Sequence, residues 1–309
     1  MFDRAADSRI RTATFDWLSG QVDRFGDVLP RSALAEGFEI DGRRVPLLGP
    51  QGIFKPAVLD VPLSITTTPH GPYDDAFGSD GYLRYRYRGT DPAHPDNRGL
   101  VFAMEERISL VYFHGIVPGK YVAAWPVFVV AANPAHLTFS IAVDDVLYSG
   151  LQVPGRDIGL VREDGEEARR RYITAVVKRR LHQRAFRERV LTAYRHACAF
   201  CRFKHEELLD AAHITGDAER NGEPVVRNGI SLCRLHHAAF DRHFLGLTPD
   251  FRIEVRRDLL EEEDGPTLLH GIQGLQGTTM RLPRRVGDRP DVERVLARYR
   301  RFQEAARAS

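Results

Sequence analysis

The chain has 309 residues, of which 43% are hydrophobic and 28% charged, and its formal net charge is +2. This composition is that of an ordinary globular protein, without repeats or low-complexity tracts, and the length favours two domains. The longest apolar stretch, residues 121–132, contains Pro126 and is too short to span a bilayer. The first residues are polar and acidic and do not form a signal peptide, so we expect a cytoplasmic protein without membrane association.

Residues 38–148 have the pattern of a β-rich domain. Short apolar runs at 108–113, 121–131 and 137–143 are separated by Gly, Pro, Asn and Asp. Runs of this length between turn-forming residues are typical of strands, so we expect a sheet here.

Residues 164–196 change to a helical pattern, in which apolar residues recur every three to five positions. Acidic residues outnumber basic ones in residues 1–150, and the reverse holds in the rest of the chain. The basic excess concentrates in this segment, which we expect to be a helical linker. Either it is a solvated helix face or it contacts the DNA backbone, and the candidate contacts are Arg179, Arg180, Arg184 and Arg187.

All three cysteines belong to one pattern with a histidine. Cys198 and Cys201 form a C-x-x-C knuckle, and Cys233 and His236 form a later C-x-x-H pair. Four such ligands satisfy a closed tetrahedral zinc site, so we expect structural zinc. Reduced thiols available for zinc agree with a cytoplasmic location. The chain around the cysteines predicts two strands and a helix that opens after Cys233.

Several strings in this region resemble the HNH, or ββα-metal, endonuclease family. They are Leu-Asp-Ala-Ala-His-Ile at 209–214, Asn-Gly-Ile-Ser-Leu at 228–232 and His-Ala-Ala-Phe-Asp at 237–241. They match the branch of the family written LEAAHI, N-G and LHxxFD, which commonly carries a helix like residues 186–194 before the first knuckle. The resemblance covers about residues 184–250.

The resemblance implies a role for each polar residue. His213 is the expected general base that activates water, and Asn228 orients it. His237 and Asp241, one helical turn apart, are the expected ligands of a catalytic divalent ion, Mg²⁺ or Mn²⁺. Asp210 either braces the site or reaches the metal. The chain departs from many HNH nucleases at Ala212, where those proteins carry another metal ligand.

Residues 50–145 resemble the SRA, or YDG, domain, which binds DNA with a modified cytosine and flips the base into a pocket. The matching positions are Tyr73, Asp75, Tyr87 and Asn97. Aromatic rings would stack on a flipped base, and the carboxylate of Asp75 would accept a hydrogen bond from the cytosine amino group. The alternative is that the tyrosines are strand residues packed on a sheet and that Asp74 and Asp75 form a turn.

These observations predict an α+β chain with three parts. They are a PUA/SRA-like β-barrel reader (1–157), a helical basic linker (158–192) and a zinc-bound HNH nuclease domain (193–309). The combination resembles type IV restriction enzymes and implies an endodeoxyribonuclease that cuts double-stranded DNA containing 5-methyl- or 5-hydroxymethylcytosine, without a nucleotide cofactor. Because one HNH site cuts one strand, we expect a homodimer. The alternatives are an HNH nuclease that reads another DNA or RNA feature, and a zinc-stabilised nucleic-acid-binding protein with a degenerate nuclease site.

Overall fold

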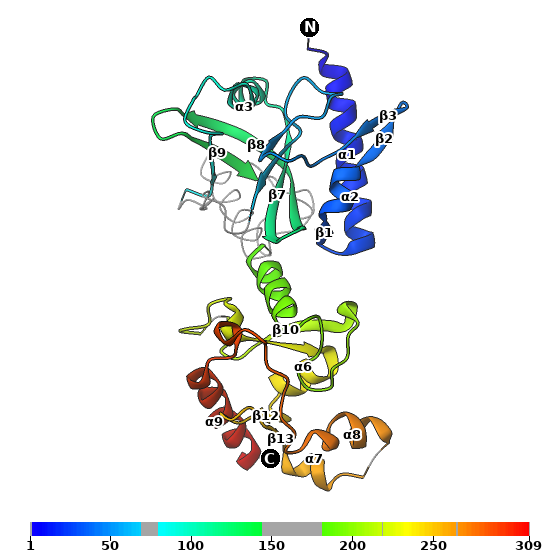
Figure 1. Ribbon diagram of the computed structural model, residues 1–309, viewed down its shortest axis with the longest axis vertical. Coiled ribbons are helices and arrows are strands. Elements are labelled where there is room, and N and C mark those ends of the chain that lie inside the picture. Colours follow the sequence, from blue (N-terminus) through cyan, green and yellow to red (C-terminus); the bar gives the residue numbers. More distant parts are fainter. Residues whose placement is uncertain (1, 69–79, 144–180, 218, 264, 309) are drawn as a thin grey trace, which may run out of the picture. The chain divides into compact units, whose positions relative to one another are not determined.

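The computed structural model describes residues 2–68, 80–143, 181–217, 219–263 and 265–308 (Figure 1). It divides into two compact units, Met1–Arg184 and Ala185–Ser309. Tyr73, Asp75, Arg179 and Arg180 lie outside the described residues, as does most of the expected linker, so the three-part division stays a prediction. None of the helices in the described ranges combines the length and apolar character needed to cross a membrane.

The first unit is built on a seven-stranded sheet with the strand order β4-β5-β7-β8-β9-β6 and with β1 paired to β8. Neighbouring strands are antiparallel except β5 and β7, which are parallel. Its strands are β1 (Val28–Pro30), β4 (Ile53–Phe54), β5 (Ser64–Thr67), β6 (Leu83–Arg86), β7 (Leu110–Val117), β8 (Lys120–Asn133) and β9 (Thr138–Val143). The three expected strands are confirmed as β7, β8 and β9.

The sheet is curled and carries helices, so the unit has a mixed α+β architecture (Figure 1). The pairings among the described residues do not join the end strands β4 and β6. Closure into the PUA/SRA-like barrel therefore stays a prediction. The remaining elements are α2 (Arg31–Glu36), the hairpin β2 (Phe38–Ile40) and β3 (Arg43–Val45), and α3 (Pro95–Glu105).

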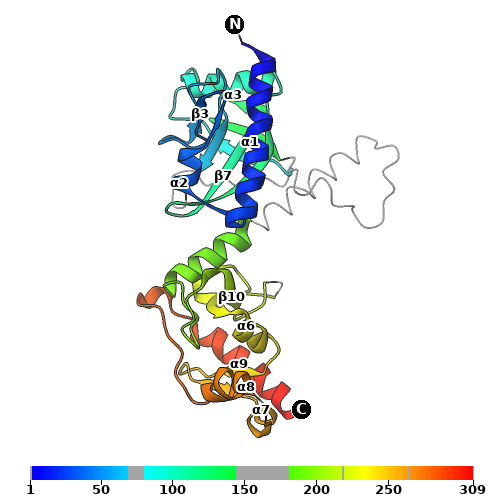
Figure 2. The ribbon, with the colours of Figure 1, turned by 90° about the vertical axis from the view of Figure 1, so that its right-hand side faces the viewer.

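A 22-residue helix, α1 (Arg4–Phe25), runs along the sheet (Figure 2). The carboxylate of its N-cap residue Asp3 accepts hydrogen bonds from the first free backbone N–H groups of the helix. Its buried face carries an ion pair, because Arg11 Nε lies 2.6 Å from Asp7 Oδ2 and both side chains are almost fully buried. Arg11 also donates to the carbonyls of Pro62 and Ser109, which ties α1 to the strands. The sequence pattern did not predict this helix.

The second unit contains the two strands and the helix expected around the cysteines. Strand β10 (Leu209–His213) pairs antiparallel with β11 (Gly229–Cys233), and α6 (Arg234–Asp241) follows directly. The helix at residues 181–193 packs against them, and Phe186 and Val190 approach Gly229 so closely that a Cβ there would lie 2.8 Å from the Phe186 ring. Glycine at 229 therefore permits the contact between this helix and the hairpin.

The rest of the unit extends the same core. The hairpin of β12 (Leu245–Leu247) and β13 (Ile253–Val255) packs against the last helix, α9 (Val292–Ala308). Ile253 and Val255 of β13 are buried, so this strand belongs to the core. A Cβ at Gly246 would lie 2.5 Å from the Phe302 ring, so a glycine lets α9 lie close to the hairpin. Two short helices, α7 (Arg257–Glu261) and α8 (Pro266–Gly271), follow β13 in the sequence and precede α9.

Candidate active site and metal centre

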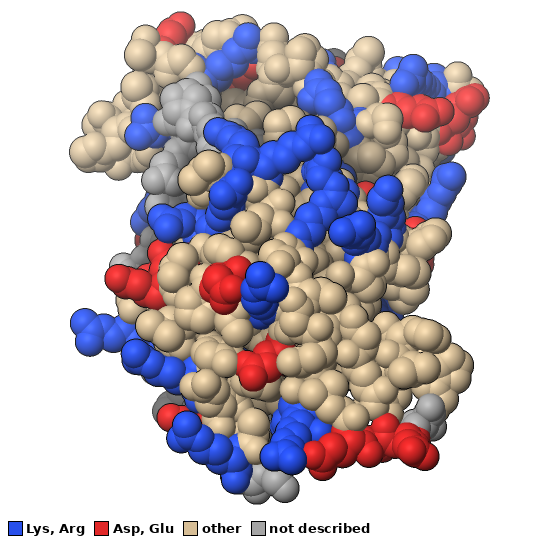
Figure 3. All heavy atoms as spheres, turned by 60° about the horizontal axis from the view of Figure 1, so that its bottom comes forward, with Lys and Arg blue, Asp and Glu red and all other residues tan. Residues whose placement is uncertain are grey.

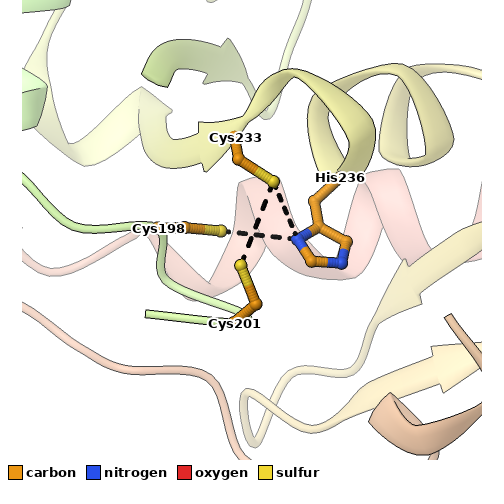
Figure 4. A group of neighbouring side chains, drawn as sticks. All are labelled: Cys198, Cys201, Cys233 and His236. Atoms are coloured by element: carbon orange, nitrogen blue, oxygen red, sulfur yellow. Dashed lines mark hydrogen bonds between the residues drawn. The ribbon is translucent and has the colours of Figure 1, made fainter. Parts of the chain in front are cut away.

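Cys198, Cys201, Cys233 and His236 lie together, with their ligand atoms within 4.8 Å of one another (Figure 4). The Sγ atoms of Cys201 and Cys233 are 3.9 Å apart, and His236 Nδ1 lies 3.5 Å from Cys198 Sγ and 3.2 Å from Cys233 Sγ. A tetrahedral zinc ion requires S···S separations of about 3.8 Å and S···N separations of about 3.5 Å. The four residues therefore fit zinc.

The histidine of this cluster is prepared to bind through Nδ1. His236 Nε2 donates a hydrogen bond to the carbonyl of Gly271 at 2.7 Å, which leaves the Nδ1 lone pair facing the sulfur atoms. Burial lowers the pKa of His236, but hydrogen bonds to Cys198 and Cys233 raise it to about 10. Nδ1 would therefore carry a proton before an ion binds, and zinc binding would displace it.

Local backbone geometry brings the four ligands together. The knuckle turns at Arg202, which has φ of 67°, and the Cys198 carbonyl accepts from the Arg202 N–H. Ala199 N–H donates to the carbonyl of Ser231, which fastens the knuckle to β11. Cys233 is the N-cap residue of α6, so the cluster holds the knuckle, the end of β11 and the first turn of α6 at one point.

His213, the expected general base, is the last residue of β10. The Phe186 ring stacks on its imidazole with centroids 4.2 Å apart, and His213 Nε2 is buried without a hydrogen-bond partner among the described residues. Burial lowers the pKa of His213 below its ordinary value of 6.5, and the nearby carboxylates of Asp217, Asp241 and Asp210 oppose this in part. The imidazole is therefore neutral at pH 7, as a base must be.

Asn228 holds the turn that follows His213. Its Oδ1 accepts from the N–H of Thr215, its Nδ2 donates to the carbonyls of Thr215 and Glu223, and its own carbonyl accepts from Ile214. The side chain is fully buried. Asn228 thus fixes the chain immediately after His213 and acts on the histidine through the backbone.

His237 lies between the carboxylates of Asp210 and Asp241. Asp241 Oδ2 is 3.2 Å from His237 Nε2, and Asp210 Oδ2 is 3.6 Å from His237 Nδ1. The hydrogen bond to Asp241 raises the pKa of His237 more than burial lowers it. Burial raises the pKa of Asp241, but the contacts with His237 and Arg298 bring it below its ordinary value.

The oxygen and nitrogen donors of this group suit Mg²⁺ or Mn²⁺, and about half of each carboxylate side chain is exposed. Because the two carboxylates face opposite ring nitrogens, an ion on His237 Nε2 would have Asp241 beside it, whereas an ion on Nδ1 would have Asp210. The residues therefore fit a divalent ion. Ala212, the position where many HNH nucleases have a further ligand, is fully buried in the core.

An open hollow of about 460 Å³ lies over α6 and is lined by Arg234, His237, Ala238, Asp241 and Arg242. Arg234 and Arg242 are exposed, and neither forms an ion pair with another described residue. The sequence analysis did not single out these two arginines. Arg234 and Arg242 lie four residues before and after Ala238, so the three share one face of the helix. His237 and Asp241 lie next to that face, and this spacing is the signal that could have revealed the two arginines.

The other predicted residues have varied surroundings. Tyr87 is buried, stacks on Phe139 at 4.1 Å and lines a cavity in the first unit. Asn97 does not line that cavity, since its amide bonds the backbone of Arg88 and Asp91. Arg184 forms an ion pair with Asp27 at 2.8 Å.

Arg187 is committed to contacts inside the protein. Its guanidinium donates to the carbonyls of Glu206 and Leu209 and to Glu188 Oε1, each at 2.8 Å, and Nε lies 3.7 Å from Asp210 Oδ1. These contacts tie the helix at 181–193 to β10 and leave one nitrogen facing Asp210.

Comparison with protein families identifies this region. Residues 198–248 match the family described as HNH endonuclease. This segment is an HNH endonuclease domain. The match includes both halves of the Cys₃His cluster and His213, Asn228, His237 and Asp241. No curated protein sequence matches the chain at a significant level.

Solved structures similar to more than three quarters of this chain include two restriction enzymes. One is the modification-dependent TagI restriction endonuclease, with 17% identity, 77% of this chain and 80% of that chain covered, and a TM-score of 0.26. The other is the type IV phosphorothioation-dependent restriction endonuclease ScoMcrA, with 14% identity, 79% and 57% covered, and a TM-score of 0.20. At TM-scores this low, neither likeness supports a functional conclusion for this chain.

Replacing Cys233 by serine is expected to remove zinc and unfold the HNH domain. Structural zinc contributes roughly 10–16 kcal/mol in small metal-dependent folds, which is comparable with the total stability of a domain. Elemental analysis and circular dichroism of the full chain measure both effects, and Ser231→Ala, a buried change beside the cluster, is the control. Wild-type protein that carries well under one zinc per chain and stays folded after chelation would contradict this assignment.

His213→Ala is expected to reduce DNA cleavage by about 10²- to 10⁴-fold, the usual contribution of a general base, without changing zinc content or DNA affinity. His205→Ala, which removes an exposed histidine, is the control. Because the pKa of His213 is lowered, its neutral form persists below pH 6.5, and the wild-type rate should fall only at lower pH. Near-normal cleavage by His213→Ala would rule out His213 as the base.

Proposed function

We propose that the protein is a modification-dependent DNA endonuclease whose N-terminal unit reads a modified cytosine by base flipping. The HNH domain then hydrolyses a phosphodiester bond. The observation that carries the nuclease half is the grouping of His237 and Asp241 along an open hollow flanked by two exposed arginines that form no ion pair with another described residue. The same small domain contains His213, a half-buried histidine whose pKa is lowered by burial.

His213 would accept the proton of the attacking water. Its neutral state follows from burial, and its position is set by Phe186 on one ring face and by the turn that Asn228 holds. A divalent ion bound beside it would stabilise the charge that develops on the phosphate and the leaving 3′-oxygen. The chain's own contribution is thus a fixed base and a fixed set of oxygen and nitrogen ligands.

Of the two possible arrangements around His237, we favour an ion on Nε2 beside Asp241. Asp210 would then accept the Nδ1–H proton and hold the imidazole in the tautomer that leaves Nε2 free. A carboxylate behind a metal-binding histidine is a common arrangement in proteins. This assignment gives Asp210 the bracing role, and the ligands are then His237 and Asp241.

Arg234 and Arg242 are proposed to contact the DNA backbone on either side of the cleaved bond. They are eight residues apart, which is about 12 Å along a helix. Successive phosphates of one strand advance about 3.4 Å along the duplex axis, so the two arginines are far enough apart to contact different phosphates. Lysine and arginine side chains are prominent on the face drawn in Figure 3, where acidic side chains form smaller groups. Both arginines are exposed at the hollow and are available to phosphate.

The reader half of the proposal is supported by the sequence resemblance and by a cavity of about 180 Å³ in the first unit. The cavity is lined by Gln51, Gly52, Ile53, Thr66, Tyr85, Arg86, Tyr87 and Arg88. Its volume is below that of sites for drug-sized molecules and suits a small planar ring. Thr66 Oγ1 is buried there without a hydrogen-bond partner among the described residues, and a bound base edge would satisfy it.

The carboxylate of Asp75 and the ring of Tyr73 would complete the pocket, as the SRA resemblance implies. A cut through both strands would require two HNH sites, so we propose that the protein acts on double-stranded DNA as a homodimer. No nucleotide cofactor is part of this proposal, because hydrolysis at the HNH site needs only water and the divalent ion.

Arg234→Gln and Arg242→Gln are each expected to weaken DNA binding and to lower the slope of log affinity against log salt by about 1, the effect of losing one phosphate contact. Fluorescence anisotropy with a duplex in the absence of divalent ions measures this slope. Arg300→Gln, which removes an exposed arginine of α9, is the control. Slopes equal to wild type in both variants would contradict the proposed contacts.

Binding of one duplex with a single changed position tests the reader. The position carries cytosine, 5-methylcytosine or 5-hydroxymethylcytosine, and another duplex carries a phosphorothioate linkage. We expect tighter binding of a modified cytosine by the wild type, and loss of this preference in Thr66→Val, which keeps the side-chain volume but removes the hydroxyl. Thr138→Val, a similar change on β9 outside the cavity, is the control.

Equal binding of all the duplexes by the wild type would overturn the reading of modified cytosine and leave the HNH nuclease. Preference for the phosphorothioate duplex would favour the alternative, a nuclease that reads another DNA feature. If Thr66→Val still binds a modified cytosine more tightly than cytosine, this cavity is not the site that reads the base.

A further inference from the structure

Helix α9 lies outside the segment that matches the HNH family, yet three of its arginines contact that segment. Arg294, Arg298 and Arg301 follow one another at intervals of four and three residues and therefore share one face of the helix. Arg294 binds Glu223 and the carbonyl of Asn221, and Arg301 binds both oxygens of Glu219. Arg298, between them, binds the end of α6.

The surroundings of Arg298 differ from those of its two neighbours. Only 12% of its side chain is exposed, and its guanidinium lies over the Phe240 ring, 4.6 Å from the centroid. Nη2 donates to the carbonyl of Phe240 at 2.9 Å. A cation at this point complements the negative C-terminal end of the α6 dipole, where the Phe240 carbonyl also accepts from the His243 N–H. Arg298 is therefore fixed by packing, by a hydrogen bond and by the helix end.

Arg298 also divides the two oxygens of Asp241 between two partners. Its Nη2 lies 3.6 Å from Asp241 Oδ1, while Oδ2 lies 3.2 Å from His237 Nε2. Asp241 is half exposed and would otherwise be free to turn toward solvent. The fixed guanidinium on Oδ1 therefore favours the rotamer in which Oδ2 faces the histidine.

Two other roles for Arg298 agree less well with these contacts. It does not line the hollow over α6, so it is badly placed to contact a DNA phosphate there. If Arg298 acted on the site only through its positive charge, its contact with the Phe240 ring and its hydrogen bond to the Phe240 carbonyl would not be needed. The side chains of Arg294 and Arg301 are more exposed than that of Arg298, and ion pairs at the surface contribute little.

We propose that Arg298 is a positioning residue of the nuclease site, which holds Asp241 in the orientation that binds the divalent ion. This inference rests on the proposed function in so far as His237 and Asp241 are the ligands. It makes α9 part of the working site, although that helix lies outside the family match.

The test uses the full-length, zinc-loaded chain and Mn²⁺ as the probe. Electron paramagnetic resonance of free Mn²⁺, without DNA, gives the affinity of wild type, Arg298→Lys, Arg298→Gln and the control Arg300→Gln. Loss of a supporting contact typically weakens metal binding by about 10- to 100-fold. We expect this loss in both Arg298 variants, since lysine keeps the charge but not the planar fork, and wild-type affinity in the control.

A double-mutant cycle with Asp241→Asn checks the route of the effect. If Arg298 acts through Asp241, Arg298→Gln should cause no further loss of Mn²⁺ affinity in the Asp241→Asn background. Cleavage of plasmid DNA by both Arg298 variants should recover at raised Mn²⁺. Zinc content and thermal unfolding establish whether each variant is folded. If Arg298→Gln does not fold, the cycle is measured with Arg298→Lys, which is the milder change.

Wild-type affinity in Arg298→Lys would show that a positive charge alone is enough and would overturn the proposal. Wild-type or tighter binding in Arg298→Gln would show that Arg298 does not support the site and would overturn it too. Additive losses in the double mutant would overturn it as well, as would the absence of a Mn²⁺ site in the wild type. Because Mn²⁺ binding is measured without DNA, the Arg298 effect can be present in a protein that cuts no DNA. That result would reject the proposed function and retain the positioning role.

Discussion

The Cys₃His cluster is the constraint on which the HNH domain depends. Cys233 is the N-cap residue of α6 and His236 lies in its first turn, so an ion that binds both together with the knuckle fixes the position and the rotation of this helix. With His236 turned inward to the sulfur atoms, the next residue, His237, is rotated by about 100° and faces the hollow, and Asp241 follows one turn later. The rotation of one short helix thus sets both expected metal ligands. Zinc bound here would contribute far more than the exposed ion pairs around the domain, so its loss would undo the active site together with the fold.

The sequence predicted the centre of this domain because its determinants are local. The C-x-x-C and C-x-x-H pairs, the two strands and α6 all lie within residues 198–241, and the spacing of the pairs reflects the metal geometry directly. Arg298 escaped notice because it reaches Phe240 from 58 positions away, and no periodic pattern connects the two. The role of Arg187 was hidden for a similar reason. It belongs to a basic run that suggests DNA contacts, yet folding turns its guanidinium toward the carbonyls of Glu206 and Leu209.

In the first unit, the strands with clear apolar runs were predicted and α1 was not. An amphipathic helix is recognised by apolar residues on its buried face, but α1 places Asp7 and Arg11 there. These two charges satisfy one another and three backbone carbonyls, which makes their burial acceptable and at the same time removes the apolar signal. The strand order could not be derived either. The parallel pairing of β5 with β7 joins segments separated by β6 and α3, and only long-range packing decides it.

Ala212 explains why the site needs so many supporting contacts. Its side chain is fully buried in the core, which leaves no space for the larger side chain of a further metal ligand without rearrangement. A site with few ligands depends more on the exact position of each. Here Asp210 has one oxygen near Arg187 and the other near His237, and Asp241 has one near His237 and the other near Arg298. A carboxylate thus lies beside each ring nitrogen of His237. Each carboxylate in turn has an arginine beside it, Arg187 from the helix at 181–193 for Asp210 and Arg298 from α9 for Asp241. In the proposed metal site, elements outside the ββα unit would thus supply the order that an additional ligand would otherwise provide.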